Sequence, residues 1–172
     1  MVNLVSVKSA LIYELKQVYD AECRTLLFVT HLLQNSRSDK LKKVIKSYRR
    51  TADLNRAKLE LIFYFFNRKV SCPENKTICS IIKECNSFNF SHPDHIHDMI
   101  IISRIEQVVY YKLSVYKRLL CYARKLGLSK ASSILSEVIE CEEDIYTDLV
   151  DTYEEIEMSE SNHSLSKTKI LH

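Results

Sequence analysis

The segment from residue 98 to residue 126 constrains the fold most, because it runs for about four heptads without glycine or proline. Lys112 lies near its middle, within the one helical face that carries most of the apolar side chains. A buried cation is costly without an anionic partner. The chain must therefore supply a carboxylate for Lys112 or let the amine reach solvent. The apolar residues of this face recur at spacings of three and four, which predicts a long helix packed against a core: Ile101, Ile105, Val108, Val109, Leu113, Tyr116, Leu119, Leu120 and Ala123.

The rest of the chain has equally few turn residues. Its 172 residues include one glycine and two prolines, whereas hydrophobic residues make up 46%. β-Sandwiches and βαβ folds need many turns, so this composition favours a single all-α domain. The net charge of +3 is spread among acids and bases, and no basic face for nucleic acid stands out. No apolar run is long enough for a membrane span, and the start of the chain lacks a signal-peptide pattern.

The six cysteines form no C-x-x-C pair. We interpret them as free thiols in a reducing cytoplasm. One disulfide within residues 72–85 is the alternative.

Three further segments show helical periodicity. We predict helices over residues 6–34, 39–67 and 130–157 in addition to 98–126, with Ser38 and Ser129 as N-caps and Gly127 at a C-terminus. The connection at residues 68–96 contains a short helical stretch at 76–85 and is long enough to run the length of a bundle. These features predict two helical hairpins joined by a long crossover, which is a four-helix bundle over residues 1–158. Residues 159–172 are polar, and we predict a mobile tail.

Two acids interrupt the inner faces of the first and last of these helices. Glu22 is the one acid on the face that includes Leu15, Val18 and Leu26. Glu142 is likewise a lone acid on the apolar face of the last helix. With Lys112, they make three charged side chains directed at one core.

Several short motifs occur in a fixed order along the chain. They are YDAE at residues 19–22, YKRLLCYARKLGLSKA at 116–131 and ECEE at 140–143. These motifs resemble Y-x-A-E, Y-x-x-L-x-x-x-A-x-x-L-G-x-x-x-A and D-E-E of the YciE/YciF-type ferritin-like proteins of bacteria, and the resemblance covers roughly residues 8–157. It implies a ferritin-like four-helix bundle, usually dimeric, with a carboxylate-rich centre that holds two metal ions.

Most metal ligands that the resemblance implies are missing. The family's H-x-x-E reads YRRT at residues 48–51, and its E-H-Y-E reads VYYK at residues 109–112. Only Glu22 and Glu142 remain where about six ligands would be needed, and Cys141 replaces the neighbour of Glu142. We therefore expect no metal and no cofactor. Our hypothesis is that Lys112 stands where metal charge would be and forms a central polar cluster with Glu22 and Glu142.

The alternative is an iron-binding oxidoreductase or iron-handling protein with a rearranged ligand set. Asp53, Glu106 and Glu143 are the nearest acids, each one or two residues from a family position. Because a helix turns by about 100° per residue, each should point partly away from the centre. The run SHPDHIHD at residues 91–98 offers more ligand atoms, but we interpret its histidines as loop residues and Asp94 or Asp98 as a helix cap.

These observations predict a non-catalytic protein. A single glycine leaves no Gly-rich phosphate loop, and no histidine lies within helical reach of a core cysteine. By resemblance we expect a stress-associated protein that acts as a homodimer or through another protein partner. The aromatic run at residues 63–66 points in several directions around its helix, so part of it should meet a partner or the crossover.

Overall fold

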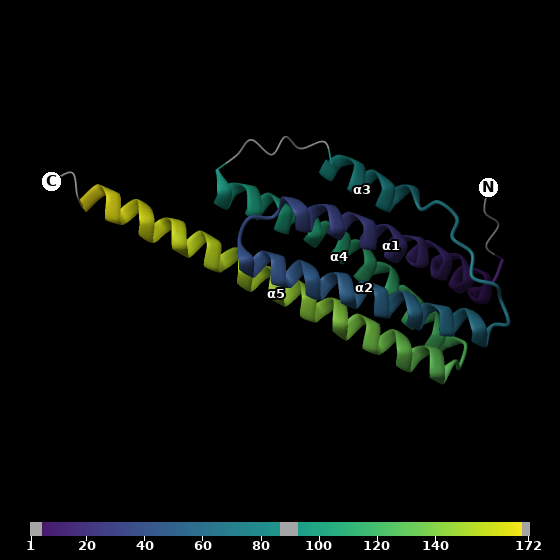
Figure 1. Ribbon diagram of the computed structural model, residues 1–172. Coiled ribbons are helices and arrows are strands. Elements are labelled where there is room, and N and C mark those ends of the chain that lie inside the picture. The colour runs from purple at the N-terminus through teal and green to yellow at the C-terminus, as the bar shows by residue number, and fades with distance from the viewer. Residues whose placement is uncertain (1–4, 87–92, 170–172) are drawn as a thin grey trace.

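The computed structural model describes residues 5–86 and 93–169. It contains five helices, and no strand occurs among these residues. Figure 1 shows the four long helices side by side, with the short helix along the outside of the bundle. The predicted all-α, ferritin-like bundle with a helical crossover is therefore confirmed. The helices are α1 (Val7–Asn35), α2 (Asp39–Phe65), α3 (Lys76–Asn86), α4 (Asp94–Lys125) and α5 (Ser129–Lys169).

Each long helix packs against two other long helices. The hairpin partners α1 and α2 pack together, as do α4 and α5, and the two hairpins meet through α1 with α4 and α2 with α5. The crossover helix α3 lies on α4 and α1. Burial of one large aliphatic side chain contributes about 1.5–3 kcal/mol, so the shared core dominates stability. Its fully buried members include Val18, Val29, Ile45, Leu59, Ile102, Leu119, Val138 and Leu149.

The hairpin ends use two of the three predicted caps, Ser38 and Gly127, whereas Ser129 is the first residue of α5 and not its N-cap. The Ser38 hydroxyl accepts a hydrogen bond from the backbone N–H of Leu41 at 3.2 Å, at the start of α2. At the end of α4, Gly127 has a φ of 67°, a left-handed conformation that glycine adopts without strain. The N–H of Leu128 then donates to the carbonyl of Ala123 at 2.9 Å, which closes a Schellman motif.

Asp98 has a different role from the one predicted. α4 begins four residues before it, after Pro93, and no side chain caps that end. The Asp98 carboxylate instead accepts the backbone N–H groups of Arg37 at 2.9 Å and Ser38 at 2.7 Å. It therefore fixes the turn between α1 and α2, which the sequence could not show because the two segments are far apart in the chain.

The last helix is longer than predicted. The sequence predicts its end near residue 157, whereas the backbone is helical to Lys169. Figure 1 shows this end of α5 extending beyond the other long helices. The mobility of residues 159–172 stays a prediction.

The described cysteines are free thiols: Cys23, Cys72, Cys79, Cys121 and Cys141. The side chain of Cys85 lies outside the described residues, as do the side chains of His92, Asp94 and His95. Among the helices that the structure describes, none combines the length and apolar character needed to cross a membrane.

Candidate functional site

The centre of the bundle holds three charged side chains from three helices. The Lys112 ammonium of α4 donates to Glu22 Oε2 of α1 at 2.9 Å and to Glu142 Oε1 of α5 at 2.7 Å. All three side chains have an exposed fraction of 0%. The structure thus brings the predicted central polar cluster together, and the amine does not reach solvent.

Three neutral side chains complete the surroundings of this cluster. Tyr116, one turn after Lys112, donates its hydroxyl proton to Glu22 Oε1. Asn55 of α2 donates its side-chain N–H to Glu142 Oε1 at 2.9 Å. The Lys112 amine also lies 4.7 Å from the centre of the Tyr48 ring, within reach of a cation–π interaction. All four long helices therefore contribute to one site.

These three residues were not predicted from the sequence to belong to the site. One signal could have found Asn55, which follows Tyr48 by seven residues and so lies on the same inner face of α2. A buried amide on an apolar face needs hydrogen-bond partners.

Burial and the opposite charges have opposing effects on these groups. Burial disfavours the charged form of Lys112, but the attraction of Glu142 and Glu22 outweighs it and holds the Lys112 pKa well above its usual value. Burial also raises the pKa of Glu142, to about 7, although Lys112 lowers it in part. Burial raises the pKa of Tyr116 and Tyr48 far above 10. Near neutral pH the cluster therefore holds one ammonium, two neutral phenols and a Glu142 carboxyl that is close to its titration point.

The donor set does not fit the two metal ions that the family resemblance implies. Both carboxylates are engaged by an ammonium at hydrogen-bond distance, and the remaining neighbours are phenols and an amide. Within the described residues, no three His, Cys, Asp or Glu side chains are grouped as metal ligands would be. Three buried polar atoms at the centre have no hydrogen-bond partner among these residues, namely Glu142 Oε2, Asn55 Oδ1 and Tyr48 OH. They are oxygens of one acid, one amide and one phenol, too few charges for two divalent cations.

The acids considered as shifted ligands lie elsewhere. Asp53 is on the surface and pairs with Arg56 at 2.9 Å. Glu143 is also exposed and pairs with Lys117 at 2.8 Å. Glu106 is half-buried, and burial alone raises its pKa. None of the three has a contact with the central cluster.

From the histidine run, His97 is described. It is buried, and its Nε2 atom lies 2.8 Å from the carbonyl oxygen of Asn35. This contact reinforces the turn that Asp98 also binds, so the described part of the run has a structural role.

A second buried polar site attaches the crossover to α1. Asp20 accepts hydrogen bonds from Arg24 Nε at 2.6 Å, the Asn75 backbone N–H at 2.9 Å and the Cys72 thiol at 3.0 Å. Burial opposes ionisation of Asp20, but these hydrogen bonds hold its pKa below the usual value. Burial and Asp20 raise the Cys72 pKa to about 12, so the thiol stays protonated and is a poor nucleophile.

Asn75 extends this attachment. Its side-chain N–H donates to the Gln17 carbonyl at 2.9 Å, and its Oδ1 accepts the backbone N–H groups of Thr77 and Ile78 at the start of α3. One residue therefore caps the crossover helix and holds it on α1.

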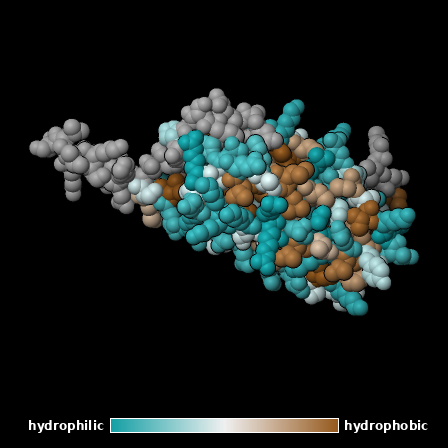
Figure 2. Space-filling model, in the orientation of Figure 1, coloured by the Kyte–Doolittle hydropathy of each residue, from teal (hydrophilic) through white to brown (hydrophobic). Residues whose placement is uncertain are grey.

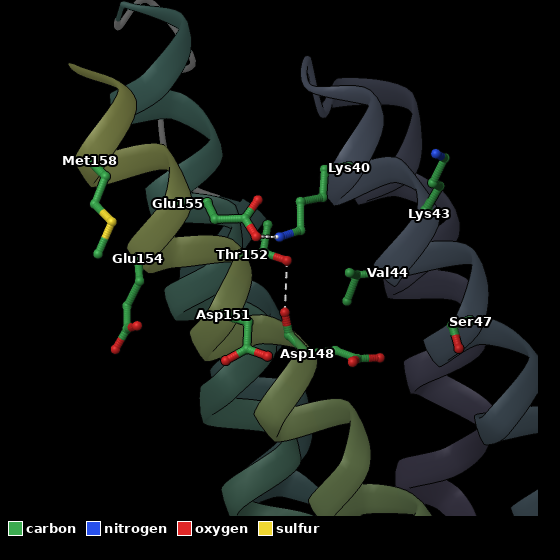
Figure 3. A pocket seen from close by; sticks show the side chains of 10 residues that line it. All are labelled: Lys40, Lys43, Val44, Ser47, Asp148, Asp151, Thr152, Glu154, Glu155 and Met158. Carbon is green, nitrogen blue, oxygen red and sulfur yellow. Dashed lines mark hydrogen bonds and ion pairs between the residues drawn. The ribbon is translucent and has the colours of Figure 1, made fainter. Parts of the chain in front are cut away.

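A surface groove of about 530 Å³ lies between α2 and α5. Figure 3 shows Lys40 of α2 reaching across it to Glu155 of α5, with Asp148 and Asp151 along the α5 wall. The groove has no contact with the central cluster, and its charged walls pair α2 with α5. We therefore treat it as part of the helix packing and not as a catalytic site.

The chain is similar to one protein family and to several solved structures. The family model described as a domain of unknown function (DUF892) matches residues 6–161. A search of curated proteins finds no match. The chain is similar to the crystal structure of the E. coli stress protein YciF, with 19% identity and a TM-score of 0.85 over 89% of this chain and 98% of that one. YcfI from Rhodopseudomonas palustris is similar with 18% identity and a TM-score of 0.80, over 86% and 94% of the two chains. A protein from Xanthomonas campestris has 12% identity and a TM-score of 0.74, over 93% and 99%.

Proposed function

The chain belongs to the DUF892 family, and we propose that it is a non-catalytic, metal-independent bundle in which a lysine replaces the metal centre. One observation carries the proposal. The Lys112 ammonium bridges Glu22 and Glu142 at 2.9 and 2.7 Å in a site that solvent does not reach. A cation already binds both carboxylates, and that cation belongs to the chain.

Charge balance supports this reading. Two divalent ions need several carboxylates around them, whereas one ammonium balances one carboxylate. The second binds a proton more readily than an ordinary carboxylate, because the pKa of Glu142 is raised to about 7. The charge that this centre holds thus matches the number of acids, and no Lewis acid is needed to keep the helices together.

A bundle without a reactive centre acts through its surfaces. We propose that this one associates with itself, as a homodimer in the cytoplasm. The free thiols of Cys23, Cys72 and Cys121 suit that reducing compartment. A role in stress responses enters by likeness to YciF, which is described as a stress protein.

Metal content tests the first part of the proposal. Protein purified without chelator is loaded anaerobically with iron(II), exchanged into metal-free buffer and measured by plasma mass spectrometry. We expect less than about 0.1 equivalent per chain. A Lys112→Glu variant is the reference, because it returns an acid to a position where the family has one, and it should retain more metal. One or two equivalents in the unaltered protein, lost on Glu22→Gln and Glu142→Gln substitution, would overturn the proposal in favour of iron handling.

A further inference from the structure

One end of the bundle exposes large apolar side chains from two segments that are far apart in the chain. The end of α2 and the α4–α5 turn meet there, and the Lys130 amine lies 6.0 Å from the centre of the Phe65 ring. The exposed fractions are 77% for Tyr64, 45% for Phe65, 43% for Val70 and 36% for Leu126. Figure 2 shows hydrophobic side chains at this end of the molecule. Exposed apolar side chains that gather in this way mark an interaction surface.

The end of α2 leaves part of its aromatic run uncovered. Asn67 follows the helix with a φ of 51°, and the Arg68 N–H donates to the Phe63 carbonyl at 3.1 Å. This is the same type of Schellman motif that ends α4. Phe63 is buried in the core, but the chain turns away before it can cover Tyr64 and Phe65.

The same two segments are basic, and we call residues 64–70 and 124–130 the basic end of the bundle. They contain five exposed cations and no acid: Arg68, Lys69, Arg124, Lys125 and Lys130. Elsewhere, cations such as Lys58 pair with acids, in that case with Glu137 at 3.2 Å. For the five cations, no ion pair is found within the part of the chain that the structure describes. Cations near a helix C-terminus interact favourably with the helix dipole, but this does not account for the exposed rings beside them.

We propose that the basic end of the bundle docks on an anionic phospholipid surface, with the rings of Tyr64 and Phe65 among the headgroups and the cations against the lipid phosphates. Aromatic side chains are favourable at the level of the headgroups, where one part of the ring is apolar and the other wet. Each Lys or Arg near an anionic bilayer strengthens binding by about fivefold. Docking of this kind needs no membrane-spanning helix and does not depend on self-association.

The shape of the basic end favours a lipid over a helical peptide. A hollow of about 370 Å³ lies between the end of α2 and the α4–α5 turn, lined by Phe65, Phe66, Leu128 and Lys130 among others. Its aromatic and aliphatic lining fits the apolar part of one lipid, and the Lys130 ammonium is available for the phosphate. A helical peptide instead needs a groove that follows it over several turns. Nucleic acid also presents phosphates, so it is included in the test.

Co-sedimentation of the full chain with vesicles tests this docking. In about 0.1 M salt we expect binding to phosphatidylcholine vesicles that contain about one third phosphatidylglycerol, and none to pure phosphatidylcholine. Removal of two cations in a Lys69→Gln, Lys130→Gln double variant should weaken binding by about 25-fold.

The matched control is a Lys43→Gln, Lys46→Gln double variant, which removes the same charge from exposed side chains of α2. Lys46 lies about 28 Å along the helix from Phe65. Because charges in about 0.1 M salt are screened over about 10 Å, this variant should bind within about twofold of the unaltered chain.

The position of the rings gives a separate readout. The chain contains no tryptophan, so Tyr64→Trp places a single indole fluorophore at the basic end. Its emission should move to shorter wavelength on anionic vesicles and be quenched by lipids with brominated acyl chains. Leu27→Trp on α1 is the matched control, because Leu27 is as exposed, at 76%, but lies outside the basic end. Its emission should not change.

Four results would overturn the docking. Equal vesicle binding by the two double variants would place the contact elsewhere, and equal binding to neutral and anionic vesicles would remove the role of the cations. A wavelength shift with Leu27→Trp and not with Tyr64→Trp would place another face on the lipid. An unaltered chain that binds no anionic vesicle would exclude lipid, and binding of a single-stranded oligonucleotide that is lost in Lys69→Gln, Lys130→Gln would assign the basic end to nucleic acid.

Discussion

Removal of the Lys112 amine is the sharpest test of the central cluster. In a Lys112→Met variant the side-chain volume stays similar, but Glu22 and Glu142 lose the cation that lies 2.9 and 2.7 Å from them. Loss of one partner of a buried ion pair costs about 3–5 kcal/mol, against a total of about 5–15 kcal/mol for a domain. With a urea m-value of about 2 kcal/mol/M, the unfolding midpoint should fall by roughly 2 M.

The exposed Lys117 gives a matched control on the same helix. It pairs with Glu143 at 2.8 Å, but these side chains are 59% and 50% exposed. An exposed pair contributes about 0–1 kcal/mol, so Lys117→Met should move the midpoint by less than about 0.5 M. The pH adds a second signature, because protonation relieves two uncompensated carboxylates. The deficit of Lys112→Met should therefore be smaller at pH 5 than at pH 8.

Equal losses in the two variants would contradict the stabilising role of Lys112. So would a Lys112→Met deficit that does not change between pH 5 and pH 8. Either result would mean that the buried carboxylates are compensated without the ammonium, and the lysine would then have no part in holding the helices together.

Four further predictions concern other residues. Because the Glu142 pKa is raised to about 7, protonation of Glu142 stabilises the folded state. This contribution is complete below about pH 4.5 and is lost as the pH rises through 7. Urea titrations from pH 5 to 8 should show the decline in the free energy of unfolding, and Glu142→Gln should flatten it. Asp98→Ala removes the acceptor of two backbone N–H groups and should lower the free energy of unfolding by about 1–3 kcal/mol. The helix content measured by circular dichroism should not change. Asp20→Ala frees the start of the crossover, so amide exchange measured by mass spectrometry should accelerate in residues 72–86 and not in α5. Gly127→Ala meets no atom within 4 Å, so its expected loss of about 1 kcal/mol comes from the positive φ alone; a neutral substitution would show that the backbone relaxes.

The long helices were predictable because their signals are local. Apolar spacing identified α1, α2, α4 and α5, and Gly127 marked a C-terminus that the structure places within the α4–α5 turn. The ends that depend on distant contacts were not predictable. The start of α4 was misplaced because Asp98 binds the turn between α1 and α2 instead of capping its own helix.

The centre was predictable in its charges and not in its neutral partners. A charged residue on an apolar helical face is a local anomaly, which is why Glu22, Lys112 and Glu142 could be singled out from periodicity. Tyr116 has no such signal, because a phenol on an inner face is common, and the amide of Asn55 indicates only that it needs a hydrogen-bond partner. Their role depends on which acid each one meets across the bundle, and only the packing of the helices determines that.

The central cluster can fix the register of the helices more strictly than apolar residues at the same positions would. Such a group adds little net stability relative to well-packed apolar side chains, so stability alone does not account for it. Its hydrogen bonds join α4 to α1, α4 to α5 and α2 to α5. A slip of one residue in any of these helices would shift its side chain by about 1.5 Å along the axis and turn it by about 100°. Such a turn would move apolar side chains out of the core, and it would also leave Lys112 as a buried cation without a partner. We therefore expect the cluster to disfavour slipped registers of the two hairpins, through a cation that the chain carries itself.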